Sequence, residues 1–146
     1  MMRMGRPALA LVVLGLTLAA APASAQPAAA PCPRATEVGQ AHLVGLWRAE
    51  FEGLPRGATV LMEKHPDDAG RVSGGINRDG ARSQLAGEVH KGEFAMEESA
   101  DGTHISGVWT GDVVEGSCGR EIRGTWQEEK DPPRPYPFVL RKQAAW

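Results

Sequence analysis

The sequence lacks most features that mark an enzyme or a metal protein. It contains no phosphate-binding loop, no nucleophile elbow and no dinucleotide-binding fingerprint. Its four histidines, at positions 42, 65, 90 and 104, have no metal-ligand spacing. A formal net charge of −2 does not suit a nucleic-acid partner, because phosphate binding needs a basic surface. We therefore expect a protein that is not an enzyme and that holds neither a metal nor a cofactor.

Long apolar runs are also scarce. The main one, residues 8–21, follows Arg3 and Arg6 and ends before a group of small residues. It is shorter than the roughly 20 residues that a membrane-spanning helix needs, and it has the pattern of a secretory signal peptide. We predict that residues 1–25 are a signal peptide and that the mature chain is periplasmic or secreted, without membrane contact. A retained N-terminal anchor is the alternative.

Cysteine is limited to two residues, Cys32 and Cys118. In an exported chain an even number of cysteines indicates a disulfide, because the compartment is oxidising. The loop-entropy model gives a bridge over such a long segment a stabilisation of roughly 4 kcal/mol. The alternative is that Cys118 is a nucleophile, although no plausible histidine partner lies nearby in the sequence.

What the sequence does contain is a repeated five-residue motif, apolar–x–Gly–x–apolar. The alternation within each copy is typical of a β-strand, and a repeated strand unit indicates a closed or stacked β architecture. A glycine inside a strand packs nothing, so we interpret these glycines as room for aromatic side chains of the next strand. Gly45, Gly107 and Gly124 are assigned such a structural role. The five copies span residues 43–47, 72–76, 85–89, 105–109 and 122–126.

Three turn signals predict how the strands pair. Asp79-Gly80, Asp101-Gly102 and Glu115-Gly116 are interpreted as two-residue hairpin loops. The resulting registers set Gly74 opposite Leu85, Phe94 opposite Trp109, and Trp109 opposite Ile122. All three registers place the repeated motifs on one face of the sheet, and a one-residue slip would break each register.

These registers predict an all-β fold, an eight-stranded antiparallel up-and-down meander barrel over residues 43–143. Residues 26–42 form a Pro- and Ala-rich lead that acts as an N-terminal lid, with weak helical character in its second half. A β-sandwich is the alternative. Strands are expected at residues 44–52, 58–65, 70–78, 81–90, 92–98, 103–113, 118–128 and 136–143.

The first and last strands carry a family resemblance. Gly45-Leu46-Trp47 opens the first strand, and Phe138-Val139-Leu140-Arg141-Lys142 closes the last. This pattern resembles the calycin group, which includes lipocalins, fatty-acid-binding proteins and avidins. The resemblance covers residues 43–142 and implies that a basic residue packs across the first-strand tryptophan, with Lys142 over Trp47 and Arg141 as the alternative. It does not imply biotin binding, because the first strand lacks the polar cluster of avidins.

In such a barrel the disulfide and the start of the first strand share one end, so a ligand mouth would lie at the other. Glu98 faces inward near that open end in the predicted register. An unpaired carboxylate there is costly, so we predict that Glu98 contacts a ligand, with Ser83 and Tyr136 as polar neighbours. The alternative is that Glu98 simply reaches solvent at the end of its hairpin.

The sequence thus predicts an exported β-barrel binding module for a small apolar or amphipathic ligand at the open end. The alternative is a protein-interaction module, such as an inhibitor of an exported hydrolase. It would act through acidic loops and the proline-rich segment 132–137. The expected partner is a small molecule or an exported protein.

Overall fold

The computed structural model describes residues 31–144 and, before them, residues 5, 15 and 19–23. The predicted signal peptide, residues 1–25, and the first part of the lead lie largely outside the described residues. Within the described part of the chain, no helix is both long and apolar enough to span a membrane.

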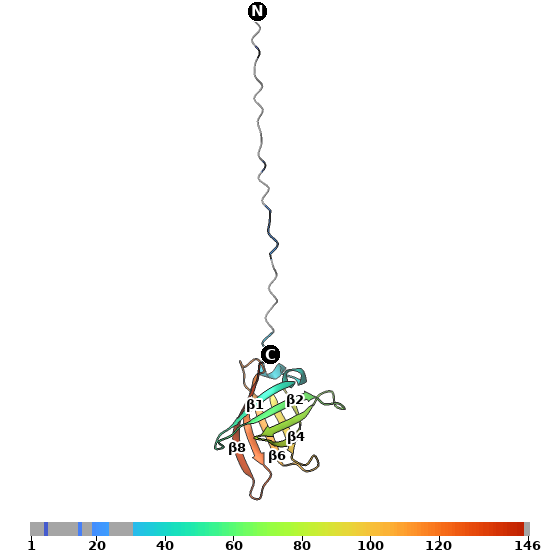
Figure 1. Ribbon diagram of the computed structural model, residues 1–146, viewed down its shortest axis with the longest axis vertical. Coiled ribbons are helices and arrows are strands. Elements are labelled where there is room, and N and C mark those ends of the chain that lie inside the picture. The colour runs from blue at the N-terminus through green and yellow to red at the C-terminus, as the bar shows by residue number, and fades with distance from the viewer. Residues whose placement is uncertain (1–4, 6–14, 16–18, 24–30, 145–146) are drawn as a thin grey trace, which may run out of the picture.

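The fold is all-β, and eight strands follow one another around a closed barrel in chain order (Figure 1). Every neighbouring pair is antiparallel, including the pair of first and last strands that closes the barrel. The predicted up-and-down barrel is therefore confirmed. The elements are η1 (Ala35–Glu37), α1 (Gln40–Leu43), β1 (Gly45–Phe51), β2 (Ala58–Lys64), β3 (Val72–Arg78), β4 (Ala81–His90), β5 (Glu93–Ser99), β6 (Gly107–Val113), β7 (Glu121–Glu128) and β8 (Arg134–Lys142).

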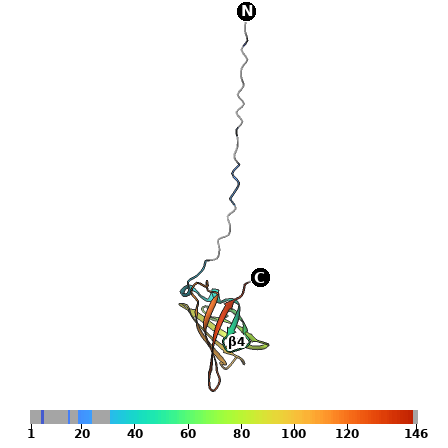
Figure 2. The same cartoon turned by 90° about the vertical axis from the view of Figure 1, so that its left-hand side faces the viewer.

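The two ends of the barrel are built differently. The short helices lie at one end, and the β7–β8 turn projects from the other, as Figures 1 and 2 show. At the helical end the predicted disulfide is present and joins Cys32 to Cys118, 86 positions apart in the sequence. Val38 and Leu43 of the helical segment belong to the buried core. We call this the disulfide end and the other the open end.

One of the three predicted registers is confirmed and two are wrong. Gly74 pairs with Leu85, as predicted. Trp109, however, pairs with Met96 on β5 and with Trp126 on β7, not with Phe94 and Ile122. Each observed register is shifted from the predicted one by an even number of residues, so every side chain keeps its predicted face.

The registers differ because the loops are longer than two residues. Between β5 and β6 the Asp101 carboxylate accepts hydrogen bonds from the backbone N–H groups of Thr103 and His104, both at 2.7 Å. These bonds hold an extended loop, residues 100–106, in place of a tight turn. The Asp-Gly signal therefore gave the position of the reversal but not its length.

Glycines let neighbouring strands of the barrel approach each other closely and leave room inside it for aromatic side chains. A Cβ atom on Gly124 would overlap the Thr110 carbonyl oxygen of the neighbouring strand, and one on Gly107 would overlap Trp126 Nε1. The first glycine thus makes room for backbone, and the second for an aromatic ring. The largest fully buried side chains inside include Trp47, Trp109, Phe94, Leu43, Met62 and Ile76.

We predict that Gly124→Ala destabilises the protein by about 2–3 kcal/mol, because the added methyl group forces two strands apart. Gly39→Ala is the control, since nothing lies within 4 Å of a Cβ at that position. Urea unfolding followed by tryptophan fluorescence measures both changes. Equal unfolding free energies for the two variants would contradict the close packing of β6 and β7.

Candidate functional site

The three predicted ligand-contacting residues lie on strands that meet at the open end. Glu98 is near the end of β5, between Leu85 on β4 and Gly107 on β6, and only 2% of its surface is exposed. Ser83 on β4 and Tyr136 on β8 are partly buried. The Glu98 carboxylate does not reach solvent, so it needs a partner inside the barrel.

That partner is Arg78, the last residue of β3. Its guanidinium donates hydrogen bonds to both carboxylate oxygens of Glu98, and the Nη2–Oε2 distance is 2.8 Å. Trp109 Nε1 donates a third bond to Glu98 Oε2 at 3.0 Å. This bidentate, charge-assisted arrangement satisfies the buried carboxylate with groups of the protein itself.

The ion pair keeps Glu98 charged. Burial acts to raise the pKa of its carboxyl, but the hydrogen bonds and charge of Arg78, with smaller contributions from Trp109 and Ser83, outweigh it and lower the pKa. Glu98 is therefore an ionised structural partner at neutral pH and not an acid poised to give up a proton.

Aromatic rings surround the cation of the pair. The Arg78 Cζ atom lies 4.3 Å from the Trp126 ring centroid and 5.7 Å from those of Phe51 and Trp109. Tyr136 stacks on Trp126 with a centroid distance of 5.6 Å. A guanidinium over several ring faces gains cation–π attraction, so the open end holds a resident cation in an aromatic cage.

Two donors in this cluster have no hydrogen-bond acceptor among the described residues. They are Arg78 Nε and Trp126 Nε1, and both atoms are buried. Buried polar groups in folded proteins are nearly always paired, so these two mark the part of the cluster that its own side chains do not satisfy.

Five hollows on the described residues measure about 250 to 590 Å³, and none of these five is lined by Glu98 or Arg78. Ser83 lines one of them, together with Leu61 and Ile76. The largest of the five lies over the outer face of β4 to β7, beside Glu88, Thr110 and Thr125. Within the described part of the chain, no three His, Cys, Asp or Glu side chains are grouped so that they could hold a metal ion.

Sequence reasoning found Glu98 but missed Arg78. The strand alternation could have indicated it. Val72, Gly74 and Ile76 occupy every second position of β3 and face inward, and Arg78 is the next residue in that series. At the disulfide end, Lys142 Nζ lies 5.9 Å from the centroid of the Trp47 ring, the arrangement that the calycin resemblance implies. Gly45 faces Lys142 there, and a Cβ atom on it would lie 2.9 Å from Lys142 Cε.

Fold and site together define an eight-stranded barrel of calycin-like architecture whose open end is occupied by its own arginine. No protein-family model matches the chain, and no curated protein matches it either.

We predict that Glu98→Gln lowers the free energy of unfolding by roughly 2–4 kcal/mol at pH 7, because the partly buried Arg78 loses its counter-charge. Since folding lowers the Glu98 pKa, the pair contributes fully above the ordinary value of 4.5 and loses its contribution as the pH falls through the folded-state pKa. The difference from wild type should therefore shrink on acidification.

Urea unfolding at several pH values tests this. Glu97→Gln, one residue away on the same strand but exposed, is the matched control. A deficit for Glu98→Gln that stays constant with pH, or that Glu97→Gln reproduces, would show that the Arg78 pair is not its source.

The two neighbouring tryptophans give a second prediction. Trp109→Phe should cost about 1–2 kcal/mol more than Trp126→Phe, because it removes a charge-assisted hydrogen bond to Glu98, whereas Trp126 Nε1 has no acceptor among the described residues. Chemical unfolding of the two variants provides the comparison. An equal or larger loss for Trp126→Phe is the contrary result.

Proposed function

We propose that this protein is an exported, non-enzymatic protein-interaction module that binds an exported partner through the rim of its open end. The rim comprises the loop of residues 100–106 and the exposed β7–β8 segment, residues 129–135. One observation carries the proposal. The barrel interior is occupied by its own side chains, including Arg78, while the rim projects from a closed frame.

Prolines and a backbone hydrogen bond restrain the rim. Every residue from 129 to 135 is exposed, and the segment contains Pro132, Pro133 and Pro135, which restrict its backbone. The Glu129 N–H donates a hydrogen bond to the Ser106 carbonyl at 3.0 Å, which ties the two parts of the rim together. A preorganised loop loses little conformational entropy on binding, which favours affinity.

The rim also has the chemistry of a protein-binding surface. Ile105, one of two large hydrophobic side chains that are notably exposed among the described residues, lies next to the Ser106–Glu129 link and is 44% exposed. Charges of both signs belong to the same rim, with the carboxylates of Glu129 and Asp131 beside the cations of Lys130 and Arg134. An apolar contact bordered by charged groups suits a partner with an apolar pocket and complementary charges around it.

Export is part of the proposal. The Cys32–Cys118 disulfide is typical of oxidising compartments, and residues 1–25 have the sequence pattern of a signal peptide. Both features favour a periplasmic or secreted protein.

A small apolar or amphipathic ligand at the open end is the second candidate function. The unpaired donors Arg78 Nε and Trp126 Nε1 favour it, because a ligand oxygen could accept from them. Such a ligand would lie against Arg78 at the open end, near Glu98, Ser83 and Tyr136.

We predict that Ile105→Ser weakens partner binding at least tenfold, because it removes the apolar contact of the rim. Leu61→Ser is the matched control, since Leu61 is 43% exposed but lies on the outer face of β2. The assay captures exported proteins of the source cell on immobilised wild type, identifies the bound protein, and measures its affinity for both variants.

Equal affinities for Ile105→Ser and Leu61→Ser would contradict the rim as the binding surface. A small molecule that raises the unfolding temperature of wild type but not of Arg78→Ala would instead support the second candidate.

A further inference from the structure

We propose that the disulfide end carries a binding site for a phosphate group, formed by Arg120, Lys142 and the backbone at Cys118 and Gly119. This site lies at the opposite end of the barrel from the rim and does not depend on the proposed function. A hollow of about 360 Å³ opens there, and its lining includes His42, Arg120 and Lys142 but no acidic residue.

The two cations belong to residues that are joined through their backbones. The Lys142 backbone N–H donates to the Arg120 carbonyl oxygen at 2.9 Å, which joins the end of β8 to the residue before β7. The Lys142 ammonium donates to the His42 carbonyl oxygen at 2.7 Å and lies over the Trp47 ring. The strand framework therefore holds two positive charges at one hollow.

Neither cation has a carboxylate partner among the described residues. Burial lowers the pKa of Lys142, and the charge of Arg120 lowers it further, so the two groups repel each other. A bound anion would remove that repulsion.

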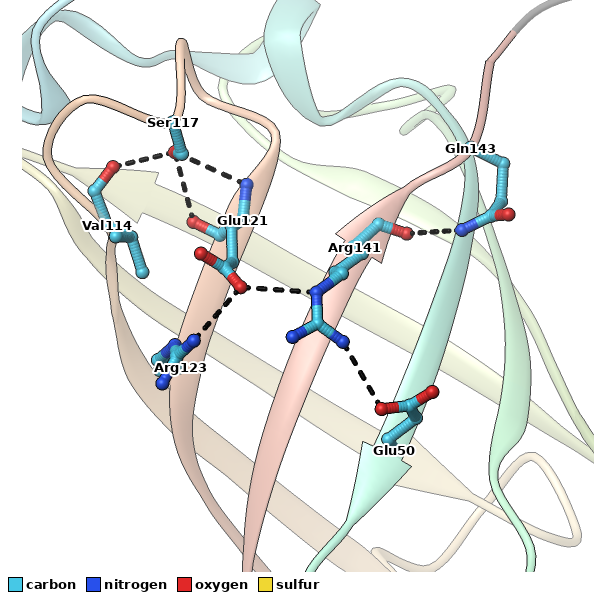
Figure 3. A network of polar contacts seen from close by, with 7 residues as sticks. All are labelled: Glu50, Val114, Ser117, Glu121, Arg123, Arg141 and Gln143. Carbon is cyan, nitrogen blue, oxygen red and sulfur yellow. Dashed lines mark hydrogen bonds and ion pairs between the residues drawn. The ribbon is translucent and has the colours of Figure 1, made fainter.

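Within the described part of the chain, the charged residues next to Arg120 and Lys142 in the sequence, unlike these two, are all paired. On the outer face of the same strands, Glu121 pairs with Arg123 and Arg141, and Arg141 also pairs with Glu50 (Figure 3). Each positive group in that network has a negative neighbour. One residue away, Arg120 and Lys142 have none within the described residues, although the whole chain has more acidic than basic residues.

Backbone donors complete the site. Cys118 and Gly119 line the hollow, and both have positive φ angles, 57° and 72°. Their N–H groups make no hydrogen bond within the described part of the chain. The disulfide to Cys32 and the Ser117 hydroxyl hold this loop. The hydroxyl donates to the Val114 carbonyl at 2.6 Å (Figure 3).

These groups match a tetrahedral oxyanion. Paired cations with adjacent backbone N–H groups are the usual means by which proteins hold phosphate. The phosphate could be a free ion or the headgroup of an anionic lipid, and the same groups would recognise both.

The test is a titration of wild type with inorganic phosphate at constant ionic strength, with sodium chloride as the reference, followed by amide NMR shifts. We expect saturable shifts at Cys118 and Gly119. Arg120→Gln, an exposed position, should weaken binding at least tenfold. Arg123→Gln, in the paired network of Figure 3, should change it less than twofold.

A second arm measures sedimentation with vesicles of phosphatidylcholine alone and of phosphatidylcholine mixed with phosphatidic acid. Binding of free phosphate that depends on Arg120 supports a site for the ion. Arg120-dependent binding to the acidic vesicles alone supports a lipid headgroup at the same site. If neither occurs, or if Arg123→Gln and Arg120→Gln weaken binding equally, the proposal is wrong.

Discussion

The open end of this barrel depends on one interaction, the buried ion pair between Arg78 and Glu98. The interior of an eight-stranded barrel can be filled by side chains or can hold one small ligand, and in either case a carboxylate inside it must find a partner there. Arg78 supplies the charge, Trp109 a further donor, and Gly107 the space, since a Cβ on it would lie 3.2 Å from Glu98 Oε2. The pair occupies the inside of the barrel at its open end.

Much of the fold could be predicted because strand alternation is a property of the sequence. The side chains of Glu98, Trp109 and Trp126 all lie on the predicted inward face, even though two registers were wrong. Loop length could not be predicted from the Asp101-Gly102 signal. It depends on local side-chain bonds, such as those of Asp101, and these change the register by whole pairs of residues without changing the face.

The site was predictable only in part. Burial of Glu98 followed from its phase, and the need for a partner followed from its charge. Which cation would reach it depended on the three-dimensional closure of β3 against β5, two strands away in the sheet. Arg78 pairs along its own strand ladder with Ala81, so no sequence neighbour indicated its contact with Glu98.

In the proposed function, a filled interior and a disulfide-bound end hold the rim, and the partner binds outside the barrel. Xenon pressurisation of wild-type crystals tests this most directly, because apolar cavities in proteins take up xenon. We expect no xenon inside the wild-type barrel, and we expect it inside Phe94→Ala, where a fully buried ring is removed. Xenon inside the wild-type barrel near Arg78 would contradict the account.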